Sequence, residues 1–280
     1  MHPILFEFET PGFLDFLLPE KITVYSYGSM IALGAILGFA YTALAGKKKL
    51  NIPFDTSNQL ILYIMISSIV GGKLFTFFEA PSRYINNPME MVSSFSQGFV
   101  FYGSLLFAIP TMIIFFRKNK IPVLPMLDIM AITTCIVYAT GRLGCFLAGC
   151  CYGVPTSGPF GVVFTDPVCQ AEPLNTPLHP TQLYSSMFAY SLIILLLIIS
   201  RHKKFDGQIF LLYLIIYPAG RIIIEYFRGD VSRGYLIKDV ITNSQFISLM
   251  ILAIAIYYYQ RLSKKSASNI SGHPVNRGKL

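Results

Sequence analysis

Apolar residues in this chain come in long blocks separated by short polar segments, rather than in stripes with a helical or strand period. A block of about 18 or more apolar residues with few charges is typical of a membrane-crossing helix. The sequence therefore predicts an all-α fold, a polytopic membrane protein with about seven transmembrane helices. The expected spans are Tyr25–Leu44, Gln59–Phe78, Phe99–Phe116, Leu127–Ala148, Gln182–Ser200, Gly207–Tyr226 and Ser244–Tyr259.

The composition agrees with a membrane protein and argues against a soluble one. Only 13% of the residues are charged and the mean hydropathy is +0.57, whereas a soluble domain carries roughly 25% charged residues. The net charge of +8 does not indicate a nucleic-acid partner. The basic residues sit in short clusters between the apolar blocks, so the topology of the chain explains them better.

The clusters of Lys and Arg also predict an orientation, because positively charged loops stay in the cytoplasm. Loops on one side of the expected spans hold most of the basic residues, and the opposite loops hold few. We therefore expect a cytoplasmic C-terminus and an N-terminus outside. The basic loops contain Lys47, Lys48, Lys49, Arg117, Lys118, Lys120, Arg201, Lys203, Lys204, Arg261, Lys264, Lys265, Arg277 and Lys279.

The domain organisation follows from the same pattern. Residues 1–263 are expected to form one membrane domain, in which the amphipathic segment 1–24 lies along the outer interface. The Gly- and Pro-rich stretch 149–180 is an outer loop of a length that is usually functional. Residues 264–280 are polar and basic, and we expect a disordered cytoplasmic tail.

Charges inside the expected spans are the first candidates for chemistry, because such charges are costly. They are Lys73 in the second span, Arg142 in the fourth, and Arg221 and Glu225 in the sixth, followed by Arg228. Arginines that converge in a membrane cavity suit a phosphate, since each offers planar bidentate donors. The alternative is structural: Arg221 and Glu225 have the spacing of a helical ion pair, and Arg228 has the place of an interfacial anchor.

Polar side chains near the ends of other spans add candidates. Tyr27 and Tyr102 each precede a Gly, which leaves room beside a hydroxyl, although small residues in spans usually serve helix packing. His179, Gln182 and Tyr184 flank Pro180 at the start of the fifth span, where Pro suits a first helical turn. A lone His is more often a structural hydrogen-bonding residue than a base.

The cysteines leave several interpretations open. Cys145, Cys150 and Cys151 lie at the outer end of the fourth span, Cys169 lies in the following loop, and Cys135 is in mid-span. A disulfide on the oxidising side is one interpretation and small apolar packing is another. The spacing C-x4-C-C matches no established zinc pattern, so we expect no metal and no cofactor.

In order and spacing, these strings resemble those of the prolipoprotein diacylglyceryl transferase family. The resemblance runs from Tyr27 to Asp230. It is carried by Tyr27-Gly28, Gly71-Gly72-Lys73-Leu74, Gly141-Arg142-Leu143-Gly144, His179-Pro180-Thr181-Gln182-Leu183-Tyr184, and Gly220-Arg221 followed by Glu225-Tyr226-Phe227-Arg228.

The resemblance implies an enzyme of the bacterial inner membrane. Such an enzyme moves the diacylglyceryl group of phosphatidylglycerol onto the lipobox Cys thiol of a preprolipoprotein, forms a thioether and releases glycerol phosphate. The partners are then phosphatidylglycerol, lipobox peptides and the lipid bilayer. The implied catalytic residues are Tyr27, Tyr102, Arg142, Arg221 and Glu225, and the implied substrate-binding residues are Arg142, Lys73, His179, Gln182, Tyr184, Arg228 and Gly153.

Two departures from the family pattern bear on the mechanism. Many members carry His where this chain has Tyr102, and Asn and Glu where it has Cys145 and Cys150. Tyrosine has a pKa near 10 and is a poor base unless a neighbouring cation lowers it. The identity of the general base therefore stays open, and the double-Cys sequence resembles a divergent branch.

Two other functions compete with the transferase. The Arg cluster also suits a carrier of an anionic metabolite, but the chain has no internal repeat of the kind that carriers use. The Cys cluster also suits a redox or metal-binding membrane protein. The order of the polar strings favours the transferase. On the expected orientation its site lies in the outer half of the membrane, in a cavity open to lipid from the side.

Overall fold

Helices make up most of the chain in the computed structural model, which describes residues 2–9, 21–79, 81–86, 101–229, 235–237 and 241–271. Every expected span overlaps a helix in its described residues, so the all-α polytopic fold class is confirmed; residues 99 and 100 of the third expected span lie outside them. The helices are α1 (Ser26–Leu50), α2 (Phe54–Glu79), the short α3 (Pro81–Asn86), α5 (Phe101–Lys118), α6 (Val123–Ala148), α7 (Thr181–Ser200), α8 (Gln208–Glu225) and α9 (Asn243–Ser271). In the described residues, six helices are long and apolar enough to cross a membrane, and α5 is not among them.

The chain divides into two compact units. The first contains Met1–Gly38 and Leu127–Leu280, and the second contains Phe39–Met126.

The second unit is built on the pair α2 and α5, which cross where two glycines meet. A Cβ atom on Gly71 would lie 2.7 Å from Cβ of Phe107, and one on Gly103 would lie 2.6 Å from Cβ of Phe75. Small residues let helix backbones approach closely in a membrane. Lys73 is buried in this unit.

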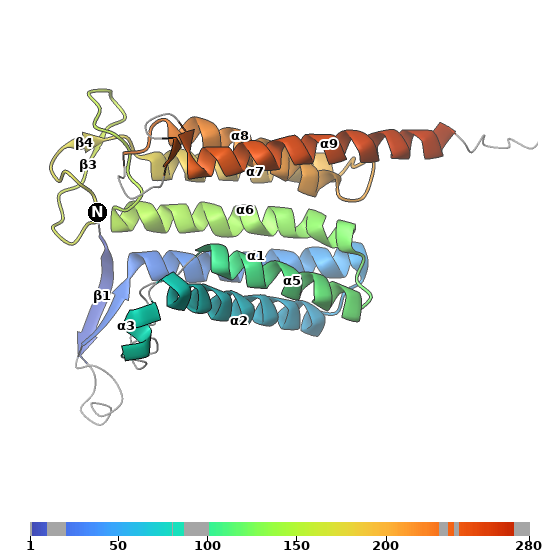
Figure 1. Cartoon of the computed structure of the whole chain (residues 1–280), viewed down its shortest axis with the longest axis horizontal. Helices are drawn as coiled ribbons and strands as arrows, with labels where there is room; N and C mark the ends of the chain where they lie inside the picture. Colours follow the sequence, from blue (N-terminus) through green and yellow to red (C-terminus); the bar gives the residue numbers. More distant parts are fainter. Residues whose placement is uncertain are drawn as a thin grey trace, which may run out of the picture. The chain divides into compact units, whose positions relative to one another are not determined.

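The first unit contains α6, α7, α8 and α9 running side by side, together with the first half of α1 (Figure 1). Helix α1 lies close against α6 at Gly144, where an added Cβ would be 3.0 Å from Cβ of Met30 and 3.2 Å from the carbonyl oxygen of Tyr27. The start of α1 is thereby held beside the end of α6.

Helices α7 and α8 pack on one another, and each has a polar tie to a further helix. The hydroxyl of Ser186 on α7 donates to the carbonyl of Ala139 on α6 at 2.9 Å. The amide of Gln208 on α8 donates to the hydroxyl of Tyr259 on α9 at 3.3 Å. Burial of these donors with partners removes most of their desolvation cost.

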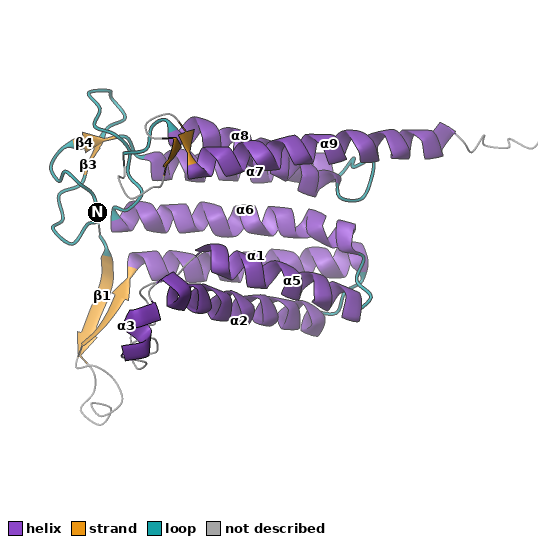
Figure 2. Ribbon diagram, in the orientation of Figure 1, coloured by secondary structure: helices purple, strands orange, loops and turns teal. Residues whose placement is uncertain are grey.

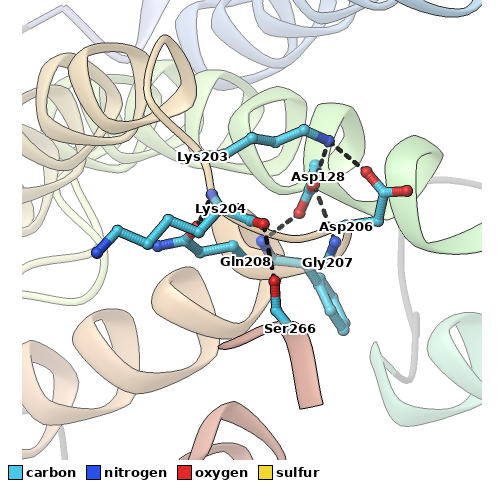
Figure 3. Close-up of polar contacts among 8 residues, drawn as sticks. Asp128, Lys203, Lys204, Asp206, Gly207, Gln208 and Ser266 are labelled. Atoms are coloured by element: carbon cyan, nitrogen blue, oxygen red, sulfur yellow. Dashed lines mark hydrogen bonds and ion pairs between the residues drawn. The ribbon is translucent and has the colours of Figure 1, made fainter. Parts of the chain in front are cut away.

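The start of α8 is capped by a carboxylate from another helix (Figure 3). Asp128 on α6 accepts hydrogen bonds from the backbone N–H groups of Gly207 and Phe210, both at 3.0 Å. Its oxygen also binds Lys203 at 3.2 Å, and Lys203 binds Asp206 at 2.8 Å. Burial alone would lower the pKa of Lys203, but the hydrogen bonds to the two carboxylates raise it. A carboxylate at a helix N-terminus accepts hydrogen bonds from backbone N–H groups that have no partner within the helix. Its negative charge also interacts favourably with the positive end of the helix dipole.

Short strands pair at the ends of the helices. The longest strands of the described chain lie in the segment 1–24, for which the sequence predicts an interfacial position. Strand β1 (Ile4–Glu9) pairs antiparallel with β2 (Lys21–Tyr25). The amphipathic pattern of this segment thus belongs, over its described part, to a β-hairpin. Two smaller pairs are β3 (Val162–Val163) with β4 (Pro177–Leu178), and β5 (Tyr235–Ile237) with β6 (Ile241–Thr242).

The loop 149–180 lies at the end of the first unit where α6 stops and α7 begins (Figure 2). It contains no helix, as expected, and it has a small apolar core of its own. Phe164, Cys169, Ala171 and Leu178 are buried there. The loop is therefore a folded cap on this end.

The expected tail begins later than the sequence indicated. Helix α9 continues through Lys264 and Lys265 to Ser271, because Lys, Ala and Ser at these positions do not break a helix. The hydroxyl of Ser266 donates to the carbonyl of Lys204 at 3.1 Å and ties this extension to the α7–α8 loop. Residues 272–280 lie outside the described part of the chain.

Candidate functional site

Arg142 lies on α6, six residues before the helix ends, and its guanidinium stacks on an aromatic ring. Its Cζ is 4.9 Å from the centroid of Tyr138, one helical turn earlier. A guanidinium over a ring face gains a cation–π attraction. Because the group is planar and already oriented by the ring, it loses little further rotamer freedom when it binds a ligand. Tyr138 therefore fixes the direction of Arg142.

Arg221 on α8 is held by a carboxylate on the same helix. Its Nη2 is 2.8 Å from Oε2 of Glu225, and the Glu225 side chain is 1% exposed. The expected ion pair is thus present. The other terminal nitrogen, Nη1 of Arg221, is buried and has no hydrogen-bond partner among the described residues. Buried donors are almost always satisfied, so this nitrogen is a position for a ligand acceptor.

Two tyrosines connect the arginines. The ring of Tyr138 meets that of Tyr217 on α8 edge to face, with centroids 5.2 Å apart. The Tyr138 side chain lies within electrostatic range of both Arg142 and Arg221. The two arginines therefore approach one shared side chain from two helices.

Sequence reasoning missed these tyrosines, although a signal was present. Tyr138 precedes Arg142 by four residues, and Tyr217 precedes Arg221 by four. Residues four apart share a helix face. The same Tyr-x3-Arg spacing on two spans therefore predicts an aromatic neighbour for each guanidinium.

The His179 segment forms an aromatic cluster with the end of α8. Nδ1 of His179 lies 3.1 Å from the hydroxyl of Tyr184, and its ring centroid lies 5.4 Å from that of Phe227. Tyr184 and Phe227 also meet edge to face at 6.2 Å. His179 is therefore a hydrogen-bonded residue in the described structure.

Gly153 lies where three segments of chain meet. Its N–H donates to the carbonyl of His179 at 2.9 Å, and it forms a β-bridge with Arg228. A Cβ atom at this position would come within 2.5 Å of Cβ of His179 and of the carbonyl oxygen of Phe227. The observed role of Gly153 is close packing that holds Arg228, which is 8% exposed, beside the loop.

The first turn of α7 anchors the two adjacent cysteines. Oγ1 of Thr181 donates to the carbonyl of Cys151, and Nε2 of Gln182 donates to the carbonyl of Cys150, both at 2.7 Å. Gln182 is fully buried, and its Oε1 has no partner among the described residues. This oxygen can therefore accept a hydrogen bond from a ligand.

All five cysteines are free thiols. The sulfur atoms of Cys145, Cys150 and Cys151 lie within 4.8 Å of one another. Hydrogen bonds from Cys145 and Cys150, followed by the charges of Arg142 and Arg228, lower the pKa of Cys151. Hydrogen bonds with the same partners raise the pKa of Cys150. The thiol of Cys150 donates to the carbonyl oxygen of Cys145 at 3.8 Å.

Most of the expected site residues lie in the first unit. Tyr27, 43% exposed, lies within electrostatic range of Arg142 and of all three clustered cysteines. Lys73 and Tyr102 belong to the second unit, and the side chain of Tyr102 lies outside the described residues. The first unit thus offers oriented guanidinium donors, an unsatisfied amide oxygen and a thiol cluster, a combination suited to binding a phosphorylated lipid beside a thiol.

Comparison with known proteins adds independent findings. Residues 15–261 match the family model described as prolipoprotein diacylglyceryl transferase. The phosphatidylglycerol–prolipoprotein diacylglyceryl transferase of Clostridium tetani is 38% identical over 259 residues, which cover 92% of this chain and 97% of that protein. The corresponding transferase 2 of Clostridium perfringens is 34% identical, with 85% and 91% covered. That of Rickettsia typhi is 32% identical, with 88% and 95% covered.

Proposed function

The chain belongs to the prolipoprotein diacylglyceryl transferase family, and on that premise we propose how its own residues carry out the transfer. The protein is a multi-pass membrane transferase of lipoprotein biosynthesis, and it catalyses the first step of lipoprotein maturation. The diacylglyceryl donor is phosphatidylglycerol, and the acceptor is the lipobox Cys thiol of a preprolipoprotein in the bacterial inner membrane.

One observation carries the proposed phosphate site. Glu225 fixes one nitrogen of Arg221 and leaves Nη1 buried without a partner among the described residues. Leaving a buried donor unsatisfied costs about 1–3 kcal/mol. A phosphate oxygen supplies the missing acceptor, and a charge-assisted hydrogen bond to it is stronger than a neutral one.

Arg142 completes this site from α6. It is aimed by the Tyr138 ring, and Tyr138 also interacts with Arg221. A phosphodiester carries one negative charge with two free oxygens, so each guanidinium binds one of them. Two cations on one monoanion become more favourable still as the leaving phosphate gains charge.

The bonds that form and break in the reaction explain why the leaving phosphate gains negative charge. The acceptor thiol loses its proton and the sulfur attacks the terminal glyceryl carbon of the diacylglyceryl group. The S–C bond forms as the C–O bond breaks, and its electron pair goes to the phosphate oxygen. Glycerol phosphate leaves with one more negative charge than the phosphodiester had. Preorganised donors at that oxygen stabilise the transition state more than the ground state.

We assign Gln182 to the recognition of a hydrogen-bond donor on a substrate. Its buried Oε1 lacks a donor, and its amide nitrogen is fixed on the carbonyl of Cys150. A glycerol hydroxyl of the headgroup or a peptide N–H of the lipobox segment fits this acceptor. We assign His179, Tyr184, Arg228 and Gly153 to the wall that frames the substrates, because they pack together beside the α7 start.

The direct test is reconstitution. Purified protein in proteoliposomes that contain acyl-labelled phosphatidylglycerol is given a lipobox peptide with Cys or the same peptide with Ser. The proposal predicts label on the Cys peptide, a thioether mass increase, and glycerol phosphate in the supernatant. Equal labelling of the Ser peptide, or no release of glycerol phosphate, would contradict it.

A further inference from the structure

The proposed phosphate chemistry does not use the three clustered cysteines of the first unit, Cys145, Cys150 and Cys151. Their sulfur atoms lie within 4.8 Å of one another. In a tetrahedral zinc site with Zn–S bonds of about 2.3 Å, neighbouring sulfurs are about 3.8 Å apart. The group therefore needs to close by only about 1 Å to hold a metal ion.

The backbone around the cluster is fixed before any ligand arrives. Thr181 and Gln182 hold the carbonyls of Cys151 and Cys150 at 2.7 Å. Cys151 has φ of 60°, a left-handed conformation that is uncommon for a residue with a side chain. Such strain persists only where the surroundings impose it, and it is most frequent at functional sites.

The ligand set is soft and incomplete. Three thiolates select Zn²⁺ or another thiophilic ion over Mg²⁺ or Ca²⁺. Among the described residues, no His, Asp, Glu or further Cys joins the group. Three protein ligands with one position left open are typical of catalytic rather than structural zinc sites.

The charges nearby suit such a site. Zn²⁺ with three thiolates carries a net charge of −1, and a fourth thiolate makes it −2. Arg142 and Arg228 both lie within electrostatic range of Cys151. Two cations beside the cluster offset this charge without occupying the metal's open position.

We propose that Cys145, Cys150 and Cys151 bind Zn²⁺ and that the acceptor thiol of the lipobox peptide takes its fourth position. This deepens the proposed function and rests on it for the identity of the acceptor. The acceptor thiol gives its proton to water as it binds the metal, because a coordinated thiol is deprotonated outright. The bound thiolate attacks the glyceryl carbon, and the neutral thioether then leaves the metal. The site performs the deprotonation for which the polar residues supply no established base.

Metal content is the first measurement. Full-length protein is purified in detergent under reducing conditions, loaded with Zn²⁺, desalted and analysed for metal. We expect about one Zn²⁺ per chain, and at least a tenfold lower content for Cys150→Ser and Cys151→Ser. Cys135→Ser and Cys169→Ser are the matched controls and should keep the metal. Unchanged zinc in the two cluster variants, or no zinc in the wild type, overturns the proposal.

The second measurement needs no variant and reads the acceptor directly. Co²⁺ replaces Zn²⁺ in the wild-type protein, and the thiolate-to-cobalt charge-transfer band is recorded. Addition of the Cys lipobox peptide should strengthen the band, whereas the Ser peptide should not. Identical spectra with the two peptides overturn the acceptor assignment. If the protein transfers label from phosphatidylglycerol after complete removal of metal, its proposed function stands and the proposed role of the metal in the transfer is overturned.

Discussion

At the scale of one residue, the proposed phosphate contact of Arg221 depends on the shape of the guanidinium as well as on its charge. Glu225 occupies Nη2, and Nη1 is buried with no partner in the described part of the chain. The contact to Glu225 and the proposed contact to phosphate both use the planar fork of a guanidinium, and the ammonium of Lys cannot reproduce them together. The sequence predicted Arg142, Arg221 and Glu225 from the cost of charge in a span. Tyr138 and Tyr217 were not among the candidates, although each lies four residues before an arginine on the same helix.

The first prediction concerns that fork. Arg221→Lys should lower the rate of diacylglyceryl transfer by about 100-fold, the effect of losing one preorganised donor to a developing anion. Arg201→Lys, on the exposed turn after α7, is the matched control and should transfer at the wild-type rate. A wild-type rate for Arg221→Lys would show that charge without geometry is enough.

The second prediction separates the ring of Tyr138 from its hydroxyl. Tyr138→Leu removes the surface under Arg142 and should raise KM for phosphatidylglycerol about 3- to 30-fold, the range of a cation–π contact. Tyr138→Phe keeps the ring and should stay within about threefold of the wild type. Steady-state kinetics over a range of lipid mole fractions measure both. Equal KM values for the Leu and Phe variants would mean that the ring does not position Arg142.

At the scale of elements, the hydrophobic blocks predicted every long helix, because a span is recognised by length and composition alone. The expected span Gln182–Ser200 differs from α7 by one residue at its start. Features that depend on pairing were missed. The pairing of β1 with β2 does not follow from the pattern of Phe6 and Phe8, whereas the interfacial position of residues 1–24 stays a prediction. The cap on α8 was also missed, because Asp128 is about 80 residues away from the N–H groups that it binds.

The third prediction tests this cap. Asp128→Ala removes three hydrogen bonds at the start of α8 and should reduce the free energy of unfolding by about 2 kcal/mol. The melting temperature of the detergent-solubilised protein should fall accordingly. Asp206→Ala is the matched control, because its side chain is 59% exposed and binds Lys203 alone among the described residues. If both variants melt at the same temperature, the cap does not stabilise the protein.

At the scale of the whole molecule, the sequence explains more of the first unit than of the second. The proposed phosphate site, the His179 segment and the thiol cluster all belong to the first unit, and α1 and α6 each contribute residues to both units. The thiol cluster could not be predicted from its spacing, because C-x4-C-C matches no zinc pattern. Its sulfurs meet only because α6 ends at Ala148 and the chain turns back through Gly149, which has φ of 78°.

The fourth prediction concerns orientation in the membrane. The excess of Lys and Arg in alternate loops predicts a cytoplasmic C-terminus and places the site at the outer leaflet. A reporter fused after Leu280 should be active if it is one that works only in the cytoplasm, such as a fluorescent protein, and inactive if it is a periplasmic phosphatase. An active phosphatase fusion with an inactive fluorescent fusion would contradict the predicted orientation. The site would then lie at the inner leaflet, away from lipobox peptides that have crossed the membrane.

The most direct test of the shared phosphate site is the initial rate of label transfer from phosphatidylglycerol to the Cys lipobox peptide by Arg142→Ala and Arg221→Ala in proteoliposomes. Each variant should lose at least about 100-fold in rate, because each removes one cation from the leaving phosphate. Arg201→Ala, reconstituted at equal protein content, should match the wild type. Wild-type rates for both site variants would contradict the assignment of Arg142 and Arg221 to the phosphate.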